Sequence, residues 1–137
     1  MPPNVAIVVA DFYQDLSNEL LAGVEGVLQN IDIKADRFFV MGALEIPPAI
    51  AQLEKKYDIY IALGAVVRGE TSHYDIVAGE SARGLMDLAI QKKMMIGNGI
   101  ITVDTMAQAV ARVDRQNGNK GGFATAAVLR LWLLSKK

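Results

Sequence analysis

The stretch NVAIVVA, at residues 4–10, is short, rich in β-branched residues and apolar on both of its faces. Such a pattern is typical of a strand in a parallel sheet that is covered on both sides. Apolar residues then recur at positions 16, 20, 24, 27 and 31, which predicts a helix from about residue 14 to residue 30. A buried strand followed at once by an amphipathic helix favours an α/β fold.

The same alternation continues along the chain. Further strands are predicted at 34–40, 57–67 and 94–103, and further helices at about 47–56, 72–92, 105–116 and 123–136. The segment NGNKGG, at 117–122, is predicted to break the chain between the last two helices. The order βαβαβαβαα implies a parallel sheet with helices on both faces. Because no linker or low-complexity tract divides the sequence, we expect a single domain over residues 1–137.

Composition limits the classes of protein that fit. With 52% hydrophobic and 21% charged residues, the chain is typical of a globular protein. The net charge of −1 argues against a nucleic-acid partner, and the absence of cysteine excludes disulfides, zinc–thiolate sites and cysteine nucleophiles. No apolar run approaches the roughly 18 residues of a membrane span, and the start of the chain lacks the pattern of a signal peptide. A cytosolic location is compatible with these features.

Unusual residues gather where the predicted strands end. Ligands of open parallel sheets bind beyond the carboxyl ends of the strands. The segments at those ends are 11–13, 41–48, 68–75 and 97–105, and they hold the only histidine, a proline pair, several glycines and several carboxylates. This crowding favours a binding site. It does not exclude a purely structural interpretation, because βα turns generally contain glycine and polar caps.

The segment RGETSHYD, at 68–75, suggests a specific chemistry. Gly69 would allow a tight turn and a close approach by a ligand, and the amides of residues 70–72 would lie at the start of a helix. Unpaired amides and the helix dipole favour an anion such as phosphate. The dipole also disfavours an imidazolium, so His73 would stay neutral near pH 7 and accept a proton. A surface or capping histidine remains the alternative, as do ordinary surface charges for Arg112 and Lys120.

Several other functional patterns do not fit. Glu70 and His73 have the i, i+3 spacing of carboxylate-bridged metal sites, but such sites need a second copy, and there is no second histidine. No G-x-S-x-G or P-loop motif occurs, and GNG at 97–99 is not a dinucleotide fingerprint. A receiver-like signalling domain would need an aspartate at the end of the third strand, where this chain has Val66 and Val67.

Four segments together resemble one known family. They are ADFY (10–13), GALEIP (42–47), GAVVRGETSHYD (64–75) and AQAVARVDRQNGNKGG (107–122), and their order and spacing resemble those of 6,7-dimethyl-8-ribityllumazine synthases. The resemblance implies a flavodoxin-like three-layer sandwich around a four-stranded parallel sheet of order 2-1-3-4. It also implies condensation of 5-amino-6-(D-ribitylamino)uracil with 3,4-dihydroxy-2-butanone 4-phosphate, without cofactor or metal, in a cytoplasmic homopentamer whose active sites lie between adjacent subunits.

The resemblance also assigns roles to residues. His73 would transfer protons. The residues that would contact the pyrimidine or its ribityl chain are Phe12, Ala43, Leu44, Glu45, Val66, Val67, Asn98 and Lys120. The residues that would hold the phosphate are Gly69, Glu70, Thr71 and Arg112. Of these, Asn98, Arg112 and Lys120 would come from the adjacent subunit.

Two departures from the family pattern predict differences in ligand binding and in assembly. Asn98 stands where many members have an aromatic residue, which predicts weaker binding of the ring. A short segment before Asp11, and DRQNGN at 114–119, favour a free pentamer over an icosahedral shell. A second hypothesis is a non-catalytic flavin or lumazine carrier on the same scaffold, which would need Phe12 and Glu45 but not His73 or Arg112.

Overall fold

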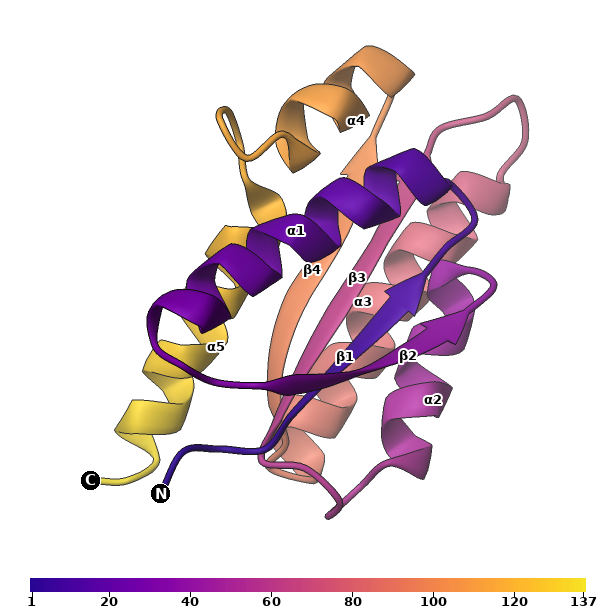
Figure 1. The fold of residues 1–137 in the computed structure, drawn as a ribbon. Coiled ribbons are helices and arrows are strands. Elements are labelled where there is room, and N and C mark those ends of the chain that lie inside the picture. Colours follow the sequence, from indigo (N-terminus) through magenta and orange to yellow (C-terminus); the bar gives the residue numbers. More distant parts are fainter.

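A computed structural model describes all 137 residues and shows one parallel sheet between two layers of helices (Figure 1). The strands are β1 (Val5–Ala10), β2 (Ala35–Val40), β3 (Ile59–Val67) and β4 (Met95–Val103). Their order in the sheet is β2-β1-β3-β4, and every neighbouring pair is parallel. The predicted α/β class and the strand order implied by the resemblance are therefore confirmed.

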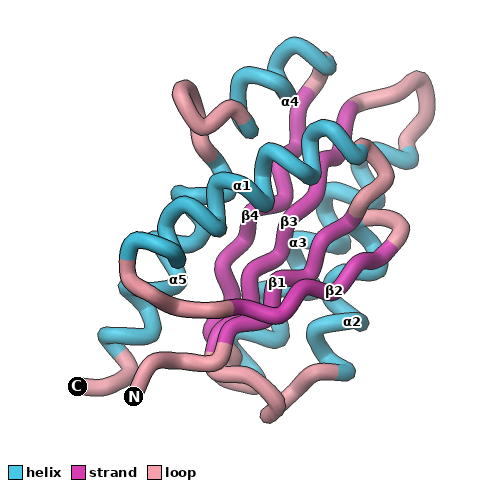
Figure 2. Tube along the Cα trace, in the orientation of Figure 1, coloured by secondary structure: helices cyan, strands magenta, loops and turns pink.

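The helices divide between the two faces of the sheet (Figures 1 and 2). They are α1 (Gln14–Asn30), the short 3-10 helix η1 (Ala43–Glu45), α2 (Ile46–Gln52), α3 (His73–Gln91), α4 (Met106–Val113) and α5 (Lys120–Leu134). Helices α1, α4 and α5 bury apolar residues in the core on one face, and η1, α2 and α3 do so on the other. No helix combines the length and the apolar character needed to cross a membrane.

Strand β1 explains why NVAIVVA is apolar on both faces. Its alternate residues Val5, Ile7 and Val9 belong to the core beneath α1 and α5, whereas Ala6 and Val8 belong to the core beneath α2 and α3. Every residue of β1 is at most 4% exposed. A strand paired on both edges and covered on both faces has no solvent side, so the alternation of a half-exposed strand is absent.

The strand register brings the predicted site segments to one edge of the sheet. Ala10 at the end of β1 pairs with Val40 at the end of β2, and Val67 at the end of β3 pairs with Val103 at the end of β4. Two further backbone hydrogen bonds extend this alignment, from Asp11 N to the Val40 carbonyl (3.0 Å) and from Arg68 N to the Val103 carbonyl (2.9 Å). The turns after the strands therefore start side by side.

Three helix boundaries differ by three residues or more from those predicted. Helix α4 ends at Val113, earlier than about residue 116. Helix α2 ends at Gln52, earlier than about residue 56, and is followed by Lys55 at a φ of 68°. Helix α5 begins at Lys120, so Gly121 and Gly122, two of the three glycines in the segment predicted to break the chain, lie in its first turn. Asn119 starts this helix in the left-handed conformation (φ 44°), and its side-chain oxygen accepts from Gly122 N at 3.3 Å. Asparagine tolerates that conformation better than most residues, which makes it an effective start here.

The glycines of α5 serve the packing of α1 against α5. A Cβ atom on Gly121 would lie 2.1 Å from the carbonyl oxygen of Leu20, and one on Gly23 would lie 2.6 Å from the Asn119 side chain. Side chains at these positions would push the two helices apart. The prediction of a chain break at 117–122 was wrong for residues 120–122, because it treated glycines required for close packing as breakers.

An ion pair ties the segment before α5 to α1, and it predicts a pH-dependent contribution to stability. Arg115 donates from its backbone N (3.0 Å) and its Nε (3.1 Å) to Glu19 Oε2. These bonds lower the pKa of Glu19, the backbone bond most strongly. A carboxyl with a lowered folded-state pKa stabilises the fold above its unfolded pKa, and this contribution disappears as the pH falls through the folded pKa.

We expect Glu19→Gln to lower the free energy of unfolding at pH 7 by about 0.5–1 kcal/mol, as for a partly exposed ion pair. The difference from the unsubstituted chain should shrink as the pH is lowered below the ordinary glutamate value of 4.5. Urea titrations at several pH values measure it, with Glu54→Gln, which removes no ion pair, as the control. A difference that is constant from pH 7 to pH 3 would contradict the assignment.

Candidate active site

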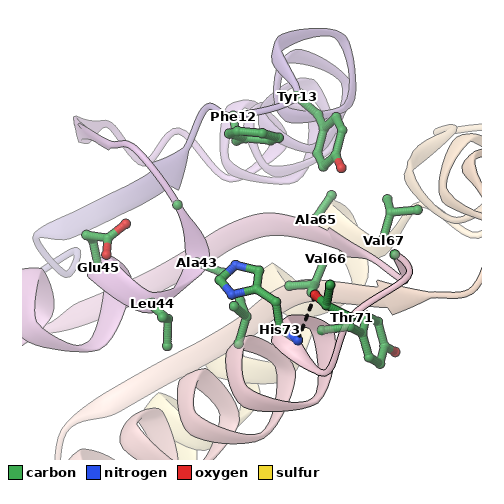
Figure 3. Close-up of a pocket in the computed structure, with 14 residues that line it drawn as sticks. Phe12, Tyr13, Ala43, Leu44, Glu45, Ala65, Val66, Val67, Thr71 and His73 are labelled. Atoms are coloured by element: carbon green, nitrogen blue, oxygen red, sulfur yellow. Dashed lines mark hydrogen bonds between the residues drawn. The ribbon is translucent and has the colours of Figure 1, made fainter.

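A cavity of about 350 Å³ lies at the carboxyl edge of the sheet (Figure 3). Its walls come from the turn after β1, from η1, from the end of β3 and from the start of α3. Nine of the residues predicted for the site line it: Phe12, Ala43, Leu44, Glu45, Val66, Val67, Gly69, Thr71 and His73. Glu70 is exposed and does not line the cavity. Segments far apart in the sequence therefore build one hollow.

The aromatic wall of the cavity is formed by the turn after β1. Phe12 is 73% exposed, and its ring contacts Tyr13 edge to face with a centroid distance of 4.8 Å. In Figure 3 this ring lies across the hollow from His73. A large apolar side chain that is exposed beside a cavity offers a surface on which a flat ring can stack.

The start of α3 offers unpaired hydrogen-bond donors beside His73. The backbone N–H groups of residues 69–72 make no hydrogen bond within the chain, and the N-cap residue Ser72 provides no side-chain cap. His73 is the first residue of α3, and its own N–H donates to Thr71 Oγ1 at 3.3 Å. Free amides at a helix N-terminus attract anions because their partial positive charges add to the helix dipole. The predicted free amides at residues 70–72 are thus present.

The role predicted for Gly69 needs a correction. No glycine in the chain has a positive φ, so the turn after β3 does not require the conformational freedom of glycine. A Cβ atom added to Gly69 would have no neighbour within 4 Å. Because Gly69 has no side chain, the wall of the cavity is open at this position.

This open space leads to a prediction. We expect Gly69→Ala to leave the thermal stability unchanged or slightly raised, because alanine restricts the unfolded chain. If the space admits an anionic ligand, such as the phosphorylated substrate that the resemblance implies, the variant should bind that ligand roughly tenfold more weakly, a factor typical of a misplaced contact. Gly26→Ala, whose Cβ would also meet nothing within 4 Å, is the matched control outside the cavity. Equal KM values for Gly69→Ala and the unsubstituted chain would contradict this interpretation.

Three predicted residues lie away from this cavity. Arg112 and Lys120 line a second hollow, of about 400 Å³, beside Thr102 and Phe123. Arg112 Nη1 lies 3.4 Å from the Thr102 carbonyl oxygen. Asn98 is exposed on β4, an edge strand of the sheet, and its Oδ1 accepts from Ile100 N at 2.9 Å. Within one chain, Arg112 and Lys120 are therefore separated from the nine residues of the first cavity, and Asn98 lines neither hollow.

Five lining residues were not among those predicted: Tyr13, Gly42, Ala65, Tyr74 and Val77. Val77 follows His73 by four residues, so the period of a helix could have placed both on one face. Gly42 and Ala65 lie inside the segments that carry the family resemblance. No group of three or more histidine, cysteine or acidic side chains lies close enough together to hold a metal ion.

An exposed ring surface, a carboxylate and unpaired amides around one hollow at the end of a parallel sheet define an α/β protein with a site for a small anionic ligand. Comparison with known proteins specifies this class. The family model for 6,7-dimethyl-8-ribityllumazine synthase matches residues 2–136. The chain belongs to the 6,7-dimethyl-8-ribityllumazine synthase family.

Individual relatives support the same conclusion. The chain is 49% identical to the 6,7-dimethyl-8-ribityllumazine synthase of Methylorubrum populi, over 96% of this chain and 82% of that protein. It is 50% identical to the synthase of Bartonella bacilliformis, over 98% of this chain and 91% of that protein. For the synthase of Agrobacterium fabrum the identity is 47%, over 98% of this chain and 96% of that protein.

Proposed function

We propose that this chain condenses 5-amino-6-(D-ribitylamino)uracil with 3,4-dihydroxy-2-butanone 4-phosphate to give 6,7-dimethyl-8-ribityllumazine, the penultimate step of riboflavin biosynthesis. Family membership supports the reaction. One structural observation supports it most strongly: unpaired amides and the only histidine share a cavity with an exposed phenylalanine. These groups match a phosphate, a proton transfer and a flat ring, respectively.

The main requirement of the reaction is that the protein holds its two substrates in position. An amine joins a ketone, phosphate and water leave, and a ring closes. No step needs a covalent enzyme intermediate, so two substrates held together and modest proton transfer account for the catalysis. Phe12 would stack on the pyrimidine and Glu45 would accept from the ribityl hydroxyls. The amides of residues 69–71 would hold the phosphate, and His73 would move the proton.

We also propose that the site is shared between adjacent subunits of a homopentamer. The residues that line the cavity include no lysine or arginine. A phosphate site normally pairs its anion with a cation. Arg112 and Lys120 line the other hollow, beside the edge strand β4, from which a neighbouring subunit could present them. Exposed apolar side chains on α5, among them Phe123 and Leu134, support an assembly that buries this helix.

The assembly has a direct test. Five chains of 14.8 kDa give a particle of about 74 kDa, whereas an icosahedral shell would approach a megadalton. Light scattering distinguishes the two, and we expect the smaller particle. We propose, further, that residues 1–137 act as one domain and that the protein works in the cytoplasm, as the resemblance implies.

The enzyme and the carrier hypotheses differ in one measurement. The two substrates are mixed with and without the protein, and the fluorescence of the lumazine is followed over time. The enzyme hypothesis predicts that the fluorescence rises faster than the spontaneous background. Binding of the lumazine without acceleration would support the carrier and contradict the enzyme.

A further inference from the structure

Arg68 connects three elements at the edge of the candidate active site. It follows directly after β3, and its Nε donates to Asp104 Oδ1, beyond the end of β4, at 2.9 Å. Its Nη1 lies 3.6 Å from Asp75 Oδ1, and its guanidinium lies over the ring of Tyr74, 4.2 Å from the centroid. Tyr74 and Asp75 belong to the first turn of α3. One side chain therefore joins both ends of the segment 69–72 to β4.

The segment between these contacts has little else to hold it. The backbone N–H groups of residues 69–72 donate to nothing within the chain, and residues 69–72 are all exposed. The hydrogen bonds that the segment accepts all come from the first turn of α3: His73 N to Thr71 Oγ1, and the amides of Asp75 and Ile76 to the Ser72 carbonyl. A segment with so few contacts is mobile unless its ends are held.

We propose that Arg68 is a positioning residue, which fixes the segment 69–72 and the start of α3 relative to β4 so that the free amides and His73 face the same cavity. The inference rests on the proposed function for its phosphorylated substrate. Arg68 does not line the cavity, and its charge faces two carboxylates, so it acts through the backbone that it holds.

Arginine suits this task better than lysine. Its guanidinium is planar and carries five donors, so one face can lie on Tyr74 while its edge donates to Asp104. The hydrogen bond to Asp104 also raises the pKa of Arg68, as expected for a guanidinium paired with a carboxylate. A lysine would keep the charge but could not stack and bridge at once.

The first test separates the two substrates. In Arg68→Met we expect the KM for the phosphorylated substrate to rise roughly tenfold, a factor typical of losing a charge-assisted contact network. The KM for the pyrimidine should stay within about twofold, since Phe12 and η1 are not held by Arg68. Arg68→Lys should fall between Arg68→Met and the unsubstituted chain. Arg37→Met is the matched control, because Arg37 is equally exposed (48%) and pairs with Glu25 outside the cavity.

The second test uses the direction in which the KM for the phosphorylated substrate changes in Asp104→Ala. Asp104→Ala removes a negative charge near the proposed phosphate site, so simple electrostatics predicts tighter binding of the phosphorylated substrate. Positioning predicts weaker binding, because Arg68 loses its hydrogen bond to Asp104, which directly follows β4. A KM that rises in both Asp104→Ala and Arg68→Met supports the inference. A KM that falls or stays constant in Asp104→Ala overturns it.

A third measurement does not depend on activity. If the unsubstituted chain does not accelerate the reaction, the proposed function fails, and hydrogen exchange then tests the positioning alone. The amides of Asp75 and Ile76, which donate to the Ser72 carbonyl, should exchange at least several-fold faster in Arg68→Met than in the unsubstituted chain. Equal exchange rates in Arg68→Met and Arg37→Met would overturn the role of Arg68.

Discussion

We expect replacement of His73 with alanine to slow formation of the lumazine by roughly a hundredfold to ten-thousandfold and to leave a measurable rate, the range for losing one general acid–base group. His73 begins α3 beside the unpaired amides, on the wall of the cavity that faces Phe12. In the proposed mechanism it moves protons on the phosphorylated substrate, and other groups hold that substrate. The substrates still meet in the His73→Ala variant, because the groups proposed to bind them remain.

Single-turnover fluorescence measures this rate, and the KM values of both substrates should change little. The imidazole is exposed and makes no hydrogen bond, and outside α3 His73 bonds only through its backbone N–H, so the thermal stability of His73→Ala should match that of the unsubstituted chain. A loss of more than about ten-thousandfold at unchanged stability would contradict a site that works mainly by positioning its substrates.

Gly121→Ala should destabilise the fold by about 3 kcal/mol, near the upper end for overpacking a tight interior. The added Cβ would lie 2.1 Å from the carbonyl oxygen of Leu20 and 2.9 Å from the carbonyl carbon of Leu20, and both are backbone atoms of α1. Backbone cannot rotate away as a side chain can, so α1 and α5 must separate. That separation would loosen the core residues Leu20 and Val128, which are both fully buried.

Urea denaturation measures the free energy of unfolding, and Gly26→Ala on α1 is its control. A Cβ on Gly26 would meet nothing within 4 Å, so alanine should stabilise the helix there by about 0.5–1 kcal/mol. Gly121→Ala should therefore lower the free energy of unfolding, and Gly26→Ala should raise it. A Gly121→Ala variant as stable as the unsubstituted chain would show that α1 and α5 are not in such close contact.

Much of the fold could be predicted because its signals are local. The apolar strand β1, the helical period of α1 and the alternation of elements each depend on neighbouring residues. The same holds for the segment 68–75, where the turn, the helix start and His73 are adjacent in sequence. The carboxyl ends of parallel strands meet at one edge, which is why residues predicted from separate segments line one cavity.

Other features depend on contacts between distant segments. Gly121 is required by Leu20, about a hundred residues earlier, so its sequence context suggested only a break. Arg68 gains its role from Asp104 on another strand end, which no spacing within the segment 68–75 reveals. Gly69 looked necessary for a turn, yet its φ is not positive, because the backbone after β3 turns within ordinary conformations.

The proposed reaction depends on a phosphate that the amides near residue 70 would hold, beside His73, in a cavity that a second subunit would complete with Arg112. Mixing two defective variants tests this most directly. His73→Ala and Arg112→Ala chains are unfolded together, refolded as a one-to-one mixture and assayed. Random assembly of subunits leaves about a quarter of the shared sites with both residues intact, so we predict about a quarter of the unsubstituted activity. A mixture no more active than the two variants refolded separately would contradict a site shared between subunits.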